Sequence, residues 1–290
     1  MREREIFSMI ELKSSNFGKV IDLVMKVPFN NYFARIVIDG KVEGRVFVDN
    51  ENSPESCLVV HKYGMALLCG RTDIDSFNRK LASFLKNDSV NHGSARWILT
   101  YPEPPWQNTL DEMLGDDLVV KYDVKENEIA EYKKNGKILQ TLRANFKFDK
   151  TLYTSCRRLP DGFRIERINH DIYCRITGSV IPVHYWKSED DFLSNGMGYS
   201  LISPENEVAC TCFTSFIVGD KYELGIETSL KFRGMGYAVY SVCAMIDFCL
   251  ANNFEPVWGC RKENLPSFKL AEKVGFTLQS YHPYYTLPVL

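Results

Sequence analysis

The sequence predicts an α+β protein made of two domains. Its 290 residues exceed the usual size of a single domain. The hydrophobic patterns alternate between strand and helix periods in both halves, and the first half echoes the element order of the second. We therefore expect an N-terminal α/β domain over residues 1–145 and a second domain over residues 146–290.

The elements of the first domain follow from apolar runs and the turns between them. Two strands flank a hairpin-like turn at Gly40-Lys41, and two more flank a turn at Tyr63-Gly64. A helical pattern then starts at Asp73 or Asp75. The expected strands are 34–39, 44–48, 57–61, 65–69 and 95–101, and the expected helices run from 73 or 75 to 85 and over 106–114.

The second domain shows the same kinds of pattern. An apolar segment at 146–154 opens it, and two long strands are joined by a turn at 203–206. The expected strands are 163–168, 196–202, 208–218, 222–228, 257–260 and 278–287, and the expected helices lie around 190–193, over 237–252 and from 264 onward.

A short motif lies between the strand at 222–228 and the helix that follows it. Residues 233–238 read Arg-Gly-Met-Gly-Tyr-Ala, which fits the pattern R-x-x-G-x-A. A glycine-bearing turn before a helix gathers backbone N–H groups at a positive helix end, and such a turn binds phosphate or pyrophosphate. Gly234 and Gly236 allow positive φ and close approach of a ligand. Alone, the pattern fits an ordinary strand-to-helix turn equally well.

A second motif follows about thirty residues later. Asn264 is placed to cap a short amphipathic helix, and Pro266 suits its first turn. Lys273 complements the negative end of the helix, and Gly275 fits the position just after it.

Together, the two motifs resemble those of the GNAT superfamily of acyl-CoA N-acyltransferases, in order and in spacing. The resemblance covers about residues 146–290 and is strong over 196–276. It implies an α/β/α sandwich with a mixed sheet. The whole chain, including 44–49, 192–196 and 256–260, looks like the two-part acetyltransferases typified by the zwittermicin A self-resistance enzyme.

The resemblance implies acetyl-CoA as the acyl donor. In this family the first motif is the pyrophosphate loop, and the preceding strand runs along the pantetheine arm. Arg233 is expected to pair with phosphate oxygens, while Lys231 is as well explained by a solvated surface position. The residues expected to bind the cofactor are Ile226, Thr228, Arg233, Gly234, Met235, Gly236, Tyr237, Ala238 and Asn264.

The catalytic groups are less clear, because the chain departs from the family pattern. Many members carry a tyrosine seven residues after the motif asparagine, where this chain has Ala271. Ser267, four residues before it on the same helix face, is either a hydrogen-bond donor to the sulfur or a small packing residue. Glu223 is the expected general base, with an exposed strand carboxylate as the alternative. The next candidates are Tyr281, His282, Tyr284 and Tyr285 on the final strand.

The first domain lacks a glycine-rich turn at the corresponding place, residues 70–75. It is therefore either a degenerate GNAT-like half or an unrelated α/β domain. In both cases we expect it to bind no cofactor and to shape the acceptor side.

Composition excludes several other classes of protein. A net charge of −2 without long basic runs argues against nucleic acid as the partner. No uncharged apolar run of about 18 residues and no signal peptide are recognisable, so a cytoplasmic protein is expected. Nine scattered cysteines indicate reduced, buried thiols. Cys210 and Cys212 have no partner pair at metal-ligand spacing, so no metal site is expected.

The sequence thus predicts an acetyl-CoA-dependent N-acetyltransferase that acts on a small-molecule amine, such as an antibiotic or a metabolite. A catalytically silent acyl-CoA-binding regulatory module is the alternative, supported by Ala271. No nucleic acid or membrane partner is expected, and the oligomeric state stays open between monomer and homodimer.

Overall fold

The computed structural model describes residues 9–87, 95–100, 105–155 and 158–288. The chain forms two compact units. The first unit holds Met1–Asn145, Arg261–Asn264 and Ser280–Leu290, and the second holds Phe146–Cys260 and Leu265–Gln279. The first boundary between the units lies after residue 145, as in the predicted division. Two segments of the range 146–290 nevertheless belong to the first unit.

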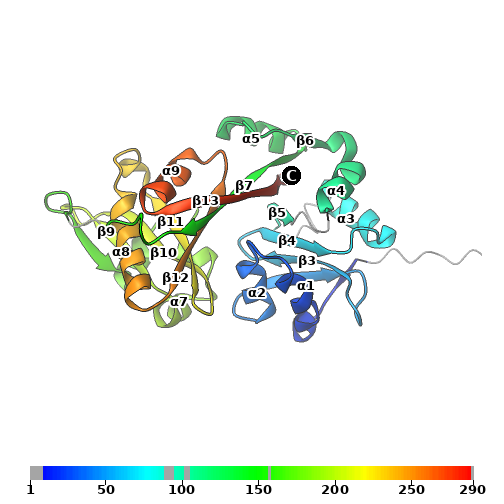
Figure 1. Ribbon diagram of the computed structural model, residues 1–290, viewed down its shortest axis with the longest axis horizontal. Coiled ribbons are helices and arrows are strands. Elements are labelled where there is room, and N and C mark those ends of the chain that lie inside the picture. The colour runs from blue at the N-terminus through cyan, green and yellow to red at the C-terminus, as the bar shows by residue number, and fades with distance from the viewer. Residues whose placement is uncertain (1–8, 88–94, 101–104, 156–157, 289–290) are drawn as a thin grey trace, which may run out of the picture. The chain divides into compact units, whose positions relative to one another are not determined.

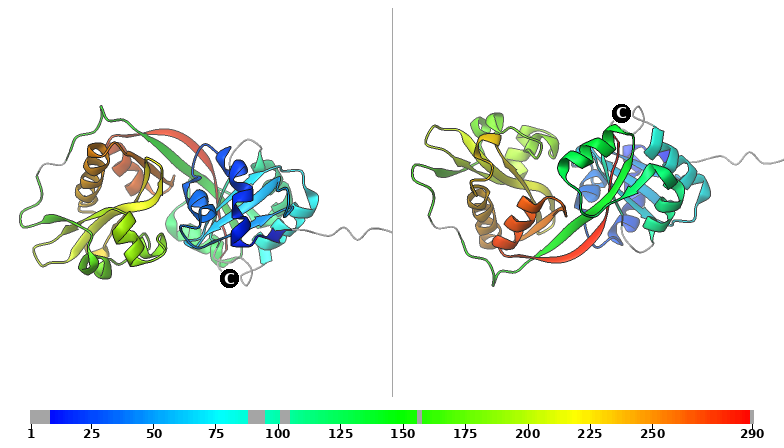
Figure 2. Two further views of the ribbon diagram at one scale, coloured as in Figure 1. Left: turned by 90° about the horizontal axis from the view of Figure 1, so that it is seen from below. Right: turned by 90° about the horizontal axis from the view of Figure 1, so that it is seen from above.

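Two long strands explain this division. β7 (Ile138–Phe148) and β13 (Phe276–Thr286) each contribute residues to both units, and the two strands lie side by side (Figures 1 and 2). In the second unit, the N–H of Asp149 donates to the carbonyl of Gly275 over 2.8 Å. In the first unit, the Thr141 hydroxyl donates to the carbonyl of Tyr284 over 3.5 Å.

The first unit places helices around an open sheet. Its strands and helices are β1 (Ile10–Glu11), η1 (Ser14–Val20), α1 (Ile21–Met25), α2 (Tyr32–Ile38), β2 (Gly44–Val48), β3 (Ser56–His61), β4 (Met65–Gly70), α3 (Asp75–Asn87), β5 (Trp97–Thr100), α4 (Trp106–Leu114), η2 (Gly115–Asp117), β6 (Leu118–Val120), α5 (Glu126–Lys134) and parts of β7 and β13.

The sheet of the first unit has the strand order β1-β2-β3-β4-β5-β13. β1 to β4 are antiparallel neighbours, β4 and β5 are parallel, and β13 runs antiparallel to β5. α3 and α4 cover an apolar face of this sheet, where Phe77, Trp106 and Tyr285 are fully buried. Since β3 and β4 are buried on both faces, this sheet forms the centre of the unit.

One expected strand is wrong, because residues 34–39 belong mostly to helix α2. β-branched residues favour a strand locally, but Phe33, Ala34, Ile36 and Val37 are the buried side chains. Their spacing is that of one helix face, so packing overrides the local preference. Asn31 donates to the carbonyl of Val27 over 2.6 Å just before the helix.

The second unit contains the remaining elements. They are β8 (Arg164–Arg167), α6 (His170–Arg175), η3 (Pro182–His184), α7 (Glu189–Asn195), β9 (Gly198–Ile202), β10 (Val208–Val218), β11 (Lys221–Thr228), η4 (Leu230–Phe232), α8 (Ala238–Ala251), β12 (Glu255–Arg261), α9 (Leu265–Lys273) and parts of β7 and β13. The strands and helices expected here from the sequence are present, with bounds that differ by a few residues.

The second unit is a mixed sheet with a helix on each face. Its strand order is β7-β12-β11-β10-β9-β8, with β8 to β11 antiparallel and β11 parallel to β12. The orange helix α8 lies on one face of the yellow strands and the yellow-green α7 on the other (Figure 2). On the α7 face, Phe213 contacts Tyr185 and Phe192 edge-on.

The two units share an order of elements. In the first, three antiparallel strands (β2, β3, β4) lead through α3 to β5, which is parallel to β4. In the second, β9, β10 and β11 lead through α8 to β12, which is parallel to β11. The echo expected from the sequence is therefore present in the strand topology.

Two further observations concern membrane-spanning helices and the cysteine thiols. Among the described residues, no helix combines the length and apolar character needed to span a membrane. Eight cysteines are described, all as free thiols, and all but Cys174 are buried; Cys156 lies outside the described residues. Cys210 and Cys212 both face the core, as expected for two residues apart on a strand, and burial raises the pKa of Cys210 to about 11.

Candidate active site

Residues 233–237 form an open loop between η4 and α8, and Ala238 begins the helix. Gly234 and Gly236 have φ values of 79° and 76°, a left-handed backbone that favours glycine. A Cβ added to either residue would meet no other atom within 4 Å. Residues 233–236 are exposed, and Tyr237, the N-cap of α8, makes no side-chain capping hydrogen bond. The backbone here has room for an anion beside the helix N-terminus, which fits the pyrophosphate of CoA.

The strands before and after α8 separate along their length. β11 pairs with β12 only over residues 221–223 and 255–257, although β11 continues to Thr228. Ile226 and Thr228 lie beyond the point of separation and are half-buried. They pair with Cys212 and Cys210 on β10, so their side chains share the α8 face with those thiols. The β12 side of β11 is thus left for another extended group, as the pantetheine arm would be.

Arg233 is held by the second unit itself. Its Nε donates to the carbonyl of Thr228 over 3.0 Å, and its Nη2 lies 3.0 Å from Oε1 of the buried Glu227. Oε2 of Glu227 accepts from the N–H groups of Ser179 and Val180, both at 2.9 Å. Glu227 therefore connects the loop to the segment before η3, and it fixes the direction of the Arg233 side chain.

Other residues in and near the loop differ in exposure and in their contacts. Lys231 is exposed and forms an ion pair with Glu207, which agrees with a surface position. Met235 is exposed as well. Tyr237 and Ala238 are half-buried at the start of α8, and the Tyr237 ring packs on Phe163 with centroids 4.9 Å apart.

Glu223 is buried, so the exposed alternative for this residue is wrong. It is the last residue of β11 that pairs with β12, and on the other side it pairs with Phe216, beside a bulge in β10 between Thr214 and Phe216. Alternation on the strand puts its side chain on the face of Gly225, where an added Cβ would meet the ring of Phe213. The Ser215 hydroxyl donates to the Glu223 carbonyl over 3.0 Å.

α9 follows the motif asparagine as expected. Asn264 is exposed and directly precedes the helix, and its N–H donates to the carbonyl of Arg261 over 3.0 Å. Ser267 accepts a hydrogen bond from Nε1 of Trp258 over 3.3 Å. Ala271 is fully buried, so the position of the usual family tyrosine is filled by the packing of the second unit.

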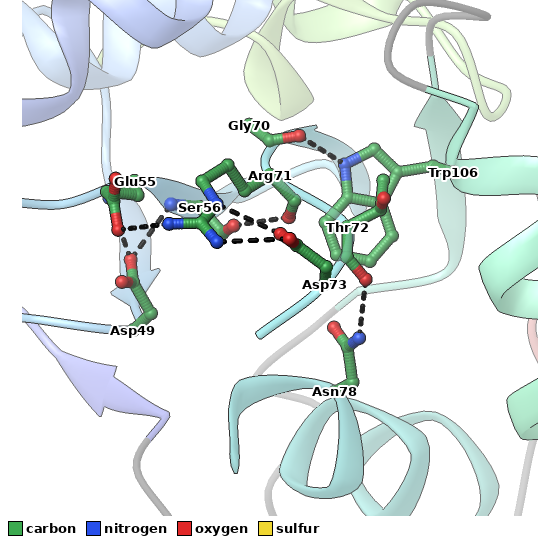
Figure 3. A network of polar contacts seen from close by, with 9 residues as sticks. All are labelled: Asp49, Glu55, Ser56, Gly70, Arg71, Thr72, Asp73, Asn78 and Trp106. Carbon is green, nitrogen blue, oxygen red and sulfur yellow. Dashed lines mark hydrogen bonds and ion pairs between the residues drawn. The ribbon is translucent and has the colours of Figure 1, made fainter. Parts of the chain in front are cut away.

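The turn at 70–75 in the first unit is closed by its own chain. A Cβ on Gly70, whose φ is 100°, would lie 2.2 Å from the carbonyl oxygen of Glu55. Arg71 bridges Glu55 and Asp73 with contacts of 2.9 Å (Figure 3). Trp106 donates from Nε1 to the Gly70 carbonyl over 3.1 Å. The space that is open at Gly234 and Gly236 is therefore occupied at Gly70.

This contrast predicts a difference in stability. Gly70→Ala combines a strained φ with a backbone clash, so we expect a loss of about 2–5 kcal/mol in the free energy of unfolding. Gly40→Ala is the matched control, because Gly40 has a φ of 66° and open space around it; about 1–2 kcal/mol is expected there. Urea denaturation measures both. Equal losses would contradict the described packing at Gly70.

The four catalytic candidates on β13 differ in their surroundings. Tyr285 belongs to the apolar core of the first unit, and Tyr281 is exposed. His282 is buried against the ring of Phe29, and burial lowers its pKa. Tyr284 lies under the guanidinium of Arg143 at 6.0 Å.

Sequence reasoning missed two charged residues of the first unit, Arg261 and Glu263. Together with Thr141 and Tyr284 they form a polar region of that unit. Arg261 is half-buried and the Glu263 side chain is nearly enclosed. The available signal was the charged run Arg-Lys-Glu between a strand and the motif asparagine.

One group of side chains in the second unit has metal-ligand chemistry. Nδ1 of His170 lies 2.6 Å from Oε1 of Glu189 and 3.9 Å from the thiol of Cys174. The first distance is that of a hydrogen bond, and His170 and Cys174 are exposed. None of the three belongs to the loop or to α9.

Comparison with known proteins identifies the family of this chain. The GNAT acetyltransferase family matches residues 25–285. An uncharacterized N-acetyltransferase of Bacillus subtilis, YdfB, is 27% identical over 257 residues, which cover 88% of this chain and 90% of that protein.

Solved structures share the fold at low identity. A GCN5-related N-acetyltransferase-like protein from Streptococcus suis superposes with a TM-score of 0.67 at 19% identity, covering 94% of this chain and 99% of that one. A GNAT-family acetyltransferase from Colwellia psychrerythraea gives 0.51 at 9% identity, with coverage of 96% and 98%.

The family match over residues 25–285 defines an acyl-CoA-dependent transferase. The chain belongs to the GNAT acetyltransferase family, whose members are N-acetyltransferases that use acetyl-CoA.

Proposed function

We propose that this protein transfers the acetyl group of acetyl-CoA to the amine of a small molecule. The observation that carries the proposal is the open backbone at Gly234 and Gly236 before an uncapped helix. We further propose that it belongs with the two-part acetyltransferases typified by the zwittermicin A self-resistance enzyme.

In this proposal, the loop and β11 bind the cofactor. The N–H groups of residues 235–238 hold the pyrophosphate, assisted by the helix dipole. The free edge of β11 at Ile226 and Thr228 contacts the pantetheine, and Asn264 contacts it from the start of α9. Arg233 donates to a phosphate from the edge of its guanidinium that does not face Glu227, while Glu227 keeps the group in place, since a guanidinium carries five donors.

The bound acetyl-CoA would supply a thioester carbonyl carbon open to attack by an amine. Glu223 accepts the proton of the amine, directly or through a water. The nitrogen lone pair then forms the new C–N bond, the C–S bond breaks, and the sulfur leaves as a thiolate. A thiol has an ordinary pKa of about 8.5, so the thiolate can leave without a tyrosine at position 271. Ser267 lies one helical turn before that position and donates a hydrogen bond to the sulfur.

We propose that the first unit is a degenerate GNAT-like half that binds no cofactor. The shared order of elements supports the relationship. The closed turn at Gly70 supports the loss of the phosphate site, because Glu55, Arg71 and Asp73 occupy its surroundings.

The test is a binding measurement followed by an acceptor screen. Native mass spectrometry and calorimetry should detect CoA or acetyl-CoA on the wild-type protein, and release of the CoA thiol should follow addition of amines from a panel. Binding without turnover of any small amine would support the silent regulatory module, whose sequence support is Ala271. The absence of any affinity for CoA would refute the proposal.

A further inference from the structure

Three side chains with metal-binding chemistry gather where α6 and α7 meet in the second unit. His170 and Cys174 lie one turn apart on α6, and Glu189 begins α7. One donor atom from each, a ring nitrogen, a thiol sulfur and a carboxylate oxygen, lies within 4.8 Å of the other two. These are the three kinds of donor that bind zinc in proteins.

The distances in this cluster are close to those of a zinc site. Bonds of about 2.0–2.3 Å in a tetrahedron place the donor atoms roughly 3.3–3.6 Å apart. In the cluster, Nδ1 of His170 lies 3.9 Å from the Cys174 sulfur and 2.6 Å from Oε1 of Glu189. Because His170 and Cys174 are exposed, a movement of about 1 Å at the ends of these side chains is enough to admit the ion.

The helices that carry the three side chains are held in place by packing. Ile172 of α6 and Phe192 of α7 are buried, and the rings of Tyr173 and Phe192 have centroids 5.8 Å apart. Asn169 and Ser188 cap the two helices with side-chain hydrogen bonds. An ion would therefore meet donors that already stand together, and little ordering of the chain opposes its binding.

The charge around the cluster also favours a cation. Three acidic residues, Glu189, Asp190 and Asp191, form the first turn of α7. Within the part of the chain that the structure describes, the Glu189 carboxylate contacts His170 and pairs with no lysine or arginine. A divalent ion would bind the carboxylate and a neutral imidazole together, and it would supply the positive charge that this contact lacks.

We propose that the second unit binds one zinc ion through His170, Cys174 and Glu189. The thiol of Cys174 releases its proton to solvent as the sulfur binds, and a water molecule completes the tetrahedron because the cluster is open to solvent. The ion links α6 to α7 and stabilises the folded unit. The site is separate from Cys210 and Cys212, the pair considered in the sequence, and it does not depend on the proposed function.

The test uses the full-length, reduced protein, freed of metal by a chelator, with Zn²⁺ and Co²⁺ as probes. Competition with a coloured zinc indicator should give one ion per chain. Cobalt in the same site should show the near-ultraviolet charge-transfer band of a thiolate ligand. Cys174→Ser should remove this band and weaken zinc binding at least about 10-fold, and Glu189→Gln should weaken zinc binding by a similar factor. Zinc should raise the Tm of the wild type but not that of Cys174→Ser.

Two substitutions outside the cluster are the matched controls. His184→Gln removes another exposed histidine of the same unit, and Cys156→Ser removes a cysteine that lies outside the described residues. Neither should change the zinc affinity or the cobalt spectrum. Cys174→His keeps a metal ligand at the same place, so its zinc affinity should stay within about 10-fold of the wild type while the thiolate band is lost.

Three results would overturn the proposal. The first is a wild-type protein that binds no zinc at micromolar concentrations of the ion. The second is an unchanged zinc affinity in Cys174→Ser. The third is a loss of affinity in His184→Gln or Cys156→Ser as large as that in Cys174→Ser, because the ion would then be bound elsewhere. Circular dichroism of each variant without metal checks that the fold is retained, as expected for an exposed side chain such as that of Cys174.

Discussion

Replacement of Gly236 by valine should reduce acetyl-CoA affinity by about 10²- to 10⁴-fold. Gly236 has a φ of 76° and open space where a Cβ would stand. A valine would place its side chain where the pyrophosphate is proposed to bind, and it would resist the left-handed backbone. Loss of two hydrogen bonds to a charged group accounts for the expected range. Calorimetry with acetyl-CoA and with CoA measures it.

Gly219→Val is the control for backbone strain. Gly219 lies in the turn between β10 and β11, with a φ of 59° and open space around it. It belongs to the same unit as Gly236, so the two substitutions should cost similar stability. Affinity should fall only in the Gly236 variant. If Gly236→Val binds acetyl-CoA as well as the wild type does, the pyrophosphate assignment is wrong.

Glu223→Gln should lower turnover by about 10²- to 10⁴-fold near neutral pH, the usual contribution of a general base. Affinity for CoA should change little. A base must be deprotonated to act, so wild-type turnover should fall as the pH drops through the pKa of that group. In the variant this acidic limb should flatten, because the titrating carboxyl is gone. A pH–rate profile of both proteins measures the effect.

Glu227→Gln is the control. It tests whether loss of any buried carboxylate on the Glu223 face of β11 would lower turnover and flatten the acidic limb in the same way. Glu227 is buried on β11, four residues after Glu223, and it holds Arg233, Ser179 and Val180. Its replacement should weaken CoA binding and stability while the pH profile keeps its acidic limb. An unchanged profile and full activity in Glu223→Gln would move the base elsewhere, with His282 as the next residue to examine.

The sequence predicted the elements whose chemistry is local. Turns with glycine, the helix after Asn264 and the strand before the loop depend on neighbours in the chain, and they form as expected. Residues 34–39 were assigned to a strand because the β-branched residues there favour one. Their burial on a single helix face depends on packing within the first unit, which no local pattern records.

The polar region around Glu263 could not be predicted for a similar reason. Thr141, Glu263 and Tyr284 lie far apart in the sequence, and their proximity arises from the pairing of strands within the first unit. The sequence showed a charged run at 261–263 but gave no sign that one carboxyl would be enclosed. The positive φ of the loop glycines could be predicted because it depends on the backbone at one place in the chain.

The place of β13 in the first sheet affects the order in which the protein is completed during synthesis. β5 pairs on one side with β4 and on the other with residues 284–286, which follow all segments of the second unit in the chain. Until these residues are synthesised β5 has an unpaired edge, and such edges readily pair with other chains. The sheet of the first unit can therefore be completed only after the whole second unit has been synthesised, and the edge of β5 stays open to other chains during that time.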